Sequence, residues 1–187
     1  NRSLEQWNSF FASVGRPELF HRTGVLWMAK GEDAAAKASL LTLAKVGIPH
    51  ERLGEDEIRK RYPQIAVIPQ GWAIWEPESG ALLARRAVQA VAADAVRAGV
   101  DYAVADVLPP SGTGRLGEIK TAGGEKVRAG SFVFACGPWL GKVVPEALEG
   151  RIFPTRQQVF FFGVPPGDSR FGPPAMPTWL DFDGNFY

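Results

Sequence analysis

The stretch GTGRLG, at residues 112–117, has the glycine spacing G-x-G-x-x-G of a dinucleotide-binding loop. In such a loop a strand ends in a tight turn and a helix begins at once, so that free N–H groups at the helix N-terminus point at the pyrophosphate. Here Pro109 and Pro110 precede the glycines, and EIKTAGGEKV, which has the pattern of two short strands around a turn, follows them. We therefore predict that GTGRLG is an exposed hairpin loop that binds no phosphate.

Few other residues have the type and spacing needed for catalysis or metal binding. Cys136 is the single cysteine, which excludes an internal disulfide and a thiolate-rich metal site. A reactive thiol needs a basic neighbour or a helix N-terminus, and His21 and His50 are both distant in sequence. The two histidines also lack the spacing of metal ligands. We predict that Cys136 is an inert buried residue, that the chain has no metal site, and that it contains no residue recognisable as the catalyst.

Composition and charge narrow the function classes. Hydrophobic residues make up 45% of the 187 residues and charged residues 22%, which is typical of a globular protein. The formal net charge of +1, without a basic run interleaved with aromatics, argues against nucleic acid as a partner. No apolar stretch approaches the roughly 18 residues of a membrane helix, and the polar opening NRSLEQWNSFF does not resemble a signal peptide. We predict a cytoplasmic protein of one large or two small domains, without a membrane partner.

Apolar periodicity predicts the elements that would position any site. In the first part of the chain we expect helices at residues 2–14, 33–46 and 55–62, and strands at residues 20–29, 50–53 and 72–75. The clearest helix follows at residues 80–98, where seven apolar residues form one stripe. The tryptophans of the strands, Trp27, Trp72 and Trp75, are interpreted as sheet-packing residues.

Later elements have a different character. We expect a strand at residues 101–108, a hairpin turning at Gly123 and Gly124, and a nearly all-apolar strand at residues 131–135. A continuous apolar run is typical of a strand buried on both faces of a parallel sheet. A long strand at residues 152–165, a Pro/Gly-rich loop and a closing hairpin across Asp183–Gly184 complete a mixed α+β (α/β) pattern.

Five stretches resemble a known family in the same order. They are RTGVLWMA, LGEDEIRKRYPQI, EPESGALLARRAVQAVAADAVRAG, FVFACGPWLGKVVPE and PTRQQVFFF. Together they are similar to the monomeric sarcosine oxidase family, within the D-amino acid oxidase-type group of FAD-dependent amine oxidoreductases. The resemblance covers nearly the whole chain, from about Leu4 to Tyr187. The resemblance does not include the family's opening βαβ unit, which carries the true glycine fingerprint. The chain therefore resembles the middle of such an enzyme.

The resemblance implies a fold and an activity. The fold would be a mostly antiparallel substrate-domain sheet with helices, plus part of a FAD-binding α/β domain. Residues 1–78 and 150–187 would belong to the substrate domain and residues 79–149 to the FAD domain. The intact enzyme would use FAD to oxidise the C–N bond of a small amine or amino acid. These residues alone, without the fingerprint, are not expected to hold FAD or to be active, and the partner of the chain would be the remainder of its own enzyme.

The resemblance also implies site residues. Ala135, Gly137 and Trp139 form a turn after the apolar strand, at the sheet edge where doubly wound folds bind ligands, and would pack beside FAD. The alternative is a turn that merely ends a core strand. Val107 and Leu108 match the position whose backbone reaches the adenine.

Two further positions match the wall of the substrate pocket in that family. Tyr187 aligns with a tyrosine near the flavin, and Thr178 aligns near another residue that lines the pocket. The alternative for Tyr187 is an exposed strand residue without a role in binding.

Two other function classes remain open at this point. One is a non-catalytic α+β module that binds a small molecule or a protein. The other is a nicotinamide-dependent dehydrogenase that uses GTGRLG, against which the missing helix argues.

Overall fold

The computed structural model describes residues 2–67, 69–111, 114–148 and 150–181, which form two compact units. Unit 1 combines residues 1–100 with residues 163–187, and unit 2 comprises residues 101–162. The chain therefore leaves unit 1, builds unit 2 and returns. How these units correspond to the predicted substrate and FAD domains stays a prediction.

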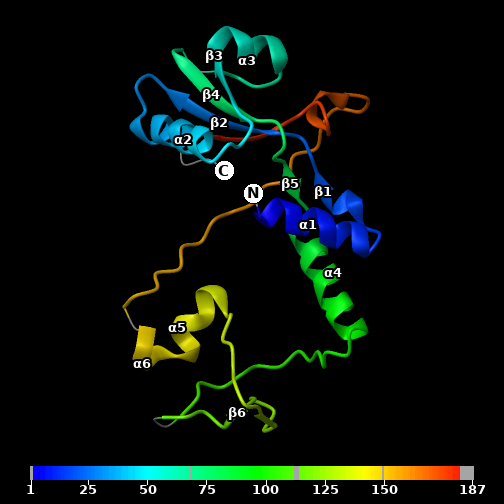
Figure 1. Cartoon of the computed structure of the whole chain (residues 1–187), viewed down its shortest axis with the longest axis vertical. Helices are drawn as coiled ribbons and strands as arrows, with labels where there is room; N and C mark the ends of the chain where they lie inside the picture. Colours follow the sequence, from blue (N-terminus) through cyan, green and yellow to red (C-terminus); the bar gives the residue numbers. More distant parts are fainter. Residues whose placement is uncertain (1, 68, 112–113, 149, 182–187) are drawn as a thin grey trace. The chain divides into compact units, whose positions relative to one another are not determined.

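A four-stranded sheet forms the centre of unit 1 (Figure 1). Its strands, in spatial order, are β3 (Glu51–Gly54), β4 (Gly71–Glu76), β2 (Val25–Lys30) and β8 (Thr178–Asp181). β4 runs antiparallel to both β2 and β3, whereas β8 runs parallel to β2. The prediction of a mostly antiparallel α+β sheet is confirmed.

Two helices cover opposite faces of this sheet. The helix α2 (Ala34–Lys45) begins where the Asp33 side chain accepts a hydrogen bond from the Ala36 amide at 2.8 Å, and it packs on Trp72 and Ile74. The helix α3 (Glu55–Arg61) buries Ile58 in a separate cluster on the other face, with alternate residues of the same strands. Because successive side chains of a strand point to opposite faces, one set of apolar strands supplies both clusters.

A third apolar cluster lies beside the sheet in unit 1. It is built from α1 (Arg2–Ser13), η1 (Pro17–Leu19), β1 (Phe20–His21), β5 (Ala81–Leu82) and α4 (Ala84–Arg97). Its fully buried side chains are Phe11, Leu19 and Ala87. These elements correct two predicted boundaries. The expected strand 20–29 is split into β1 and β2, and the expected helix 80–98 begins only at Ala84, because residues 81–82 pair with β1.

The split between β1 and β2 falls at a crowded backbone junction. Gly24 has a φ of +71° and donates its amide to the Ser79 carbonyl at 2.9 Å. A Cβ at Gly24 would overlap the Trp75 ring, and a Cβ at Gly80 would overlap the His21 carbonyl oxygen. The TG and SG pairs of two family-like stretches therefore contact each other, and each glycine is required by space.

The residues just before β8 are tied to the rest of unit 1. They include η3 (Ser169–Phe171), and the Gln64 side-chain amide donates to the carbonyls of Arg170 at 3.1 Å and Ala175 at 3.0 Å. Gln64 thus connects the turn after α3 to the approach of β8, and the sheet gains its parallel edge strand.

The described residues of unit 2 form short elements. They are β6 (Glu118–Lys120), β7 (Lys126–Arg128), η2 (Gly137–Trp139), α5 (Leu140–Val143) and α6 (Pro145–Leu148). The predicted hairpin at Gly123–Gly124 is confirmed, with β6 and β7 antiparallel and a φ of +85° at Gly124. Residue Val107 extends it by an antiparallel bridge to Thr121.

Three predicted strands are wrong in unit 2 and just after it. Residues 101–108, apart from the bridge at Val107, and residues 131–135 and 152–165 form no strand in this structure. Several of their apolar side chains are open to solvent, with Val104 89%, Val133 91% and Phe161 94% exposed, whereas Phe132 and Phe134 are half-buried. An apolar run forms a strand only when neighbouring strands complete its hydrogen bonds, and among the described residues only Thr121, beside Val107, forms a β-bridge with these segments. The stripe of α4 is exposed in part: Val88 is 64% exposed, whereas Ala87 is fully buried.

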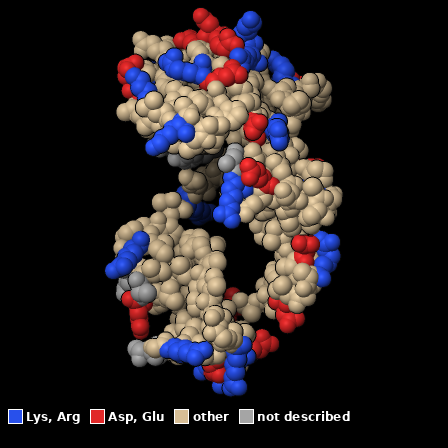
Figure 2. All heavy atoms as spheres, in the orientation of Figure 1, with Lys and Arg blue, Asp and Glu red and all other residues tan. Residues whose placement is uncertain are grey.

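Charged groups of both signs are interspersed on the surface seen in Figure 2. On α3, Arg59 pairs with Glu55 at 2.9 Å and Arg61 pairs with Glu57 at 2.7 Å, one turn apart. Such pairs neutralise each other locally, so this face has no large field of one sign. Among the described residues, every helix is too short or too polar to traverse a lipid bilayer.

Candidate functional site

The predicted substrate residue Thr178 is the first residue of β8. Its amide donates to the Gly24 carbonyl at 3.2 Å, and its hydroxyl lies 3.4 Å from the hydroxyl of the buried Thr23. Thr178 is itself half-buried. The position therefore depends on the Gly24 junction. Tyr187 and the expected hairpin at Asp183–Gly184 lie outside the described residues.

Strand register places Thr178 in a row that crosses three strands. Thr178 lies beside Val25 of β2, and Val25 lies beside Glu76 of β4. In the next row of the same face, Trp27 lies beside Ile74. This face is the one that α2 covers in part, and it brings a hydroxyl, an indole and a carboxylate together.

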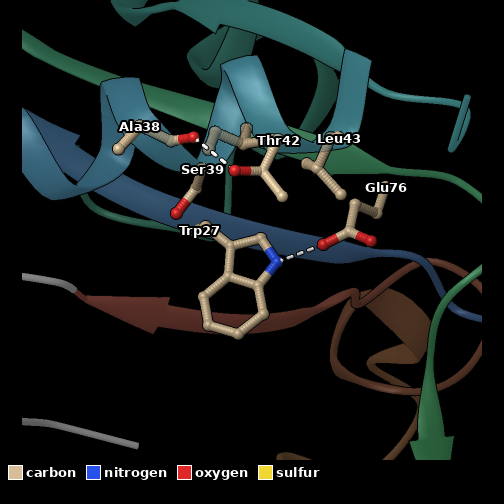
Figure 3. Close-up of a pocket in the computed structure, with 7 residues that line it drawn as sticks. Trp27, Ala38, Ser39, Thr42, Leu43 and Glu76 are labelled. Atoms are coloured by element: carbon tan, nitrogen blue, oxygen red, sulfur yellow. Dashed lines mark hydrogen bonds between the residues drawn. The ribbon is translucent and has the colours of Figure 1, made fainter. Parts of the chain in front are cut away.

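A pocket of about 390 Å³ opens on this face between α2 and the strands (Figure 3). Its lining residues come from three elements: Trp27 of β2, Ile74 and Glu76 of β4, and Ala38, Ser39, Thr42 and Leu43 of α2. The volume lies within the range of about 300–1,000 Å³ that small-molecule sites occupy. The lining is mostly alkyl and aromatic, which suits an organic ligand.

Glu76 is the charged residue of this pocket. Its Oε1 accepts the indole N–H of Trp27 at 2.6 Å, and its Oε2 accepts the Ser79 hydroxyl at 3.4 Å. Glu76 is half-buried, and no lysine, arginine or histidine in the described ranges forms an ion pair with it. The arrangement can accept further hydrogen bonds and can attract a cation.

The pocket was not predicted from the sequence. Trp72 and Trp75 do pack on the sheet as expected, but Trp27 also lines the pocket through its half-buried indole. The available signal was the single acidic residue that ends the apolar strand GWAIWE. A carboxylate in that position, facing the same side as Trp27, is unusual for a residue that only packs.

The predicted cofactor residues all lie in unit 2. Val107 and Leu108 are 38% and 44% exposed, and the Leu108 amide donates to the Lys120 carbonyl at 2.9 Å. Ala135, Gly137 and Trp139 lie at one exposed turn that includes η2 and leads into α5, and Trp139 is 63% exposed. Since Thr178 belongs to unit 1, a site that combines it with these five residues stays a prediction.

Two further predictions concern Cys136 and metals. Cys136 immediately precedes η2 and is half-buried, so the prediction that it is buried is wrong. The turn exposes it because the preceding residues 131–135 have no sheet around them. Within the part of the chain that the structure describes, no group of three or more histidine, cysteine, aspartate or glutamate residues could hold a metal ion.

The GTGRLG stretch can be followed from Gly114 onward. Gly114 has a φ of +92°, and residues 114–117 run directly into β6. Because a strand and not a helix follows, the described part of the stretch presents no helix N-terminus to a phosphate.

Comparison with known proteins adds an independent finding. The family described as DAO, FAD dependent oxidoreductase, matches residues 1–187. The monomeric sarcosine oxidase of Bacillus sp. (strain B-0618) is 30% identical over 169 residues, which cover 86% of this chain and 42% of that enzyme. The monomeric sarcosine oxidase of Streptomyces avermitilis is 25% identical over 190 residues, which cover 98% of this chain and 48% of that enzyme. The chain therefore spans less than half the length of both enzymes. The solved structure of NikD, an amino acid oxidase of nikkomycin biosynthesis, has a TM-score of 0.59 at 22% identity, covering 79% of this chain and 38% of that one.

Proposed function

Because the chain belongs to the FAD-dependent oxidoreductase family, we propose that the intact protein uses FAD to oxidise the C–N bond of a small amine or amino acid. The observation that carries the proposal is the family match over the whole chain. The relatives named above, two monomeric sarcosine oxidases and an amino acid oxidase, support this substrate class. Sarcosine is the first substrate to test.

The residues of unit 2 are compatible with a contact to FAD. Gly137 has a φ of +52° and open space where a Cβ would lie, so a flat ligand can approach its backbone. Trp139 beside it exposes an aromatic ring, and Ala135 is small and exposed. Val107 and Leu108 would contact the adenine end. When bound, FAD supplies the acceptor for the two electrons removed from the substrate.

The residues of unit 1 would bind and orient the substrate. The Thr178 hydroxyl can donate or accept a hydrogen bond at the edge of the sheet, and the apolar sheet would exclude water from the reacting carbon. Tyr187 would add a phenol to the same wall. No acid–base catalyst is assigned to these residues, which agrees with a wall whose role is orientation.

The experiment that tests the function uses the complete protein. It should be purified with a visible flavin spectrum, and anaerobic addition of sarcosine or another small secondary amine should bleach that spectrum. Oxygen uptake with the same amines then distinguishes an oxidase from an enzyme that uses another acceptor. A protein that contains no flavin, or flavin that no amine or amino acid reduces, would contradict the proposal.

Tyr187→Phe in the complete enzyme is expected to lower kcat/KM by about tenfold, because one hydrogen bond to the substrate is lost while the ring is kept. Tyr102→Phe is the matched control, since Tyr102 is 65% exposed in unit 2 and should leave kinetics unchanged. Steady-state rates at several amine concentrations, with thermal unfolding to confirm equal stability, make the comparison. Equal kinetics for Tyr187→Phe and wild type would remove Tyr187 from the site.

Gly114→Ala is expected to leave the affinity for FAD unchanged. The glycine spacing of GTGRLG lacks a following helix, so the only cost should be about 1 kcal/mol of stability from the positive φ of Gly114. Titration of the apoprotein with FAD, followed by flavin fluorescence, measures the affinity. A tenfold weaker affinity in a folded variant would restore GTGRLG as a phosphate loop.

The other two function classes receive less support. A nicotinamide-dependent dehydrogenase would need the helix that GTGRLG lacks, and a non-catalytic module would not account for the match to an oxidoreductase family over all residues. The cytoplasmic location remains a prediction from composition.

A further inference from the structure

The pocket beneath α2 has features that the proposed oxidation does not use. We propose that it is a binding site for a small organic ammonium ion, with the Glu76 carboxylate as the counter-charge and the Trp27 indole as the adjoining wall. The ligand class is an alkylammonium whose chain lies among alkyl groups. This inference goes beyond the proposed function, because it uses only the geometry of unit 1.

The charge of Glu76 is the first argument. A carboxylate loses hydration as it is buried, and a nearby cation compensates for that loss. Glu76 is held by two neutral donors instead, Trp27 at 2.6 Å and Ser79 at 3.4 Å, and no cation of the described chain compensates it. A carboxylate can accept about four hydrogen bonds, so acceptor positions are left for an ammonium group.

The hydroxyl donors of α2 beside the carboxylate already have partners. On α2, the Ser39 hydroxyl donates to the Ala35 carbonyl at 3.0 Å and the Thr42 hydroxyl donates to the Ala38 carbonyl at 2.9 Å. Both hydroxyl hydrogens are therefore used within the helix, whereas each oxygen can still accept a hydrogen bond. The Glu76 carboxylate is the charged acceptor of the pocket.

The lining selects an organic cation over a metal ion. Mg²⁺ and Ca²⁺ require several oxygen ligands, and this pocket offers one carboxylate among alkyl groups of Ala38, Leu43 and Ile74. An ammonium ion with a short alkyl chain fills such a space, and an indole attracts a nearby cation through its ring. In Figure 3, α2 forms one wall of the pocket, and Trp27 with its bond to Glu76 forms the other.

The test titrates the complete protein, labelled with 5-fluorotryptophan, with n-butylammonium chloride. The ¹⁹F resonance of Trp27, identified by its loss in Trp27→Phe, should shift saturably in the millimolar range. The neutral 1-butanol should bind at least tenfold more weakly, and butyrate should not bind. This comparison needs no variant of the pocket. Equal binding of 1-butanol, or no saturable shift with butylammonium, would overturn the proposal.

Two variants locate the effect. Glu76→Gln keeps an oxygen for the Trp27 indole but removes the charge, and it should weaken butylammonium at least tenfold. Glu78→Gln is the matched control, since Glu78 is exposed two residues along the chain, and it should bind as wild type does. Ser39→Leu should block the pocket without altering charge. Wild-type affinity in folded Glu76→Gln and Ser39→Leu would place the ligand elsewhere and reject the site, whatever substrate the enzyme oxidises.

Discussion

Replacing Gly24 with alanine is expected to lower the free energy of unfolding by about 3–5 kcal/mol, enough to prevent folding of a marginal protein. Two costs add. Gly24 has a φ of +71°, which an alanine adopts only with strain, and the new Cβ would overlap the Trp75 ring. The ring has little room to move, because it also packs against Tyr62 with 5.7 Å between ring centroids.

The variant Gly31→Ala is the control that separates the cost of the positive φ from the cost of the overlap with Trp75. Gly31 has a similar positive φ of +54° but no atom within 4 Å of its would-be Cβ, so it should lose only about 1 kcal/mol. Urea unfolding of the complete protein, followed by tryptophan fluorescence, measures both variants. If Gly24→Ala and Gly31→Ala have equal midpoints, the close approach of Trp75 is not important for stability.

Gly80→Ala is expected to cost about 2–4 kcal/mol for a different reason. The φ of Gly80 is available to alanine, but a Cβ there would overlap the His21 carbonyl oxygen and lie 2.9 Å from the Thr23 amide nitrogen. Both are backbone atoms, which cannot rotate away as a side chain can. The substitution should therefore separate β5 from β1 and disturb Thr23, the neighbour of Thr178.

The control for Gly80→Ala is Gly117→Ala, at a glycine with no neighbouring atom and no positive φ. It should change the unfolding midpoint little. In the complete enzyme, Gly80→Ala should also raise the KM for the amine if Thr178 orients the substrate. A Gly80→Ala protein as stable as wild type would show that the junction adapts, contrary to the expectation.

The sequence was sufficient for the elements of unit 1 whose partners lie close by in the chain. The strands β2, β3 and β4 and the helices α2 and α3 lie within residues 25–76 and bury one another, so their apolar periodicity predicts their structure. Residues 131–135 have an equally apolar pattern but no strand beside them among the described residues. Periodicity reports that a segment suits burial; it does not say which segment will cover it.

The candidate site was less predictable than the fold. Thr178 was expected on the substrate sheet, and its place in the row with Val25 and Glu76 depends on strand register, which no local pattern specifies. Glu76 becomes a candidate binding residue because it accepts a hydrogen bond from Trp27, which lies 49 residues away in the sequence. Contacts of that range arise from topology, so sequence reasoning found the motif around Glu76 but not the pocket.

The parallel pairing of β8 with β2 has a consequence for how the protein is made. Val25 and Thr178 are adjacent in the sheet although roughly 150 residues separate them, so closing that loop costs chain entropy before the contact forms. During synthesis, β2 emerges from the ribosome long before β8. The edge of β2 that pairs with β8 therefore stays open while unit 2 is translated. An open strand edge is a template for pairing with other chains. We therefore expect the yield of soluble protein to rise at low temperature or with a chaperone that binds nascent chains. Such a chaperone would protect the edge of β2 until β8 is synthesised and pairs with it.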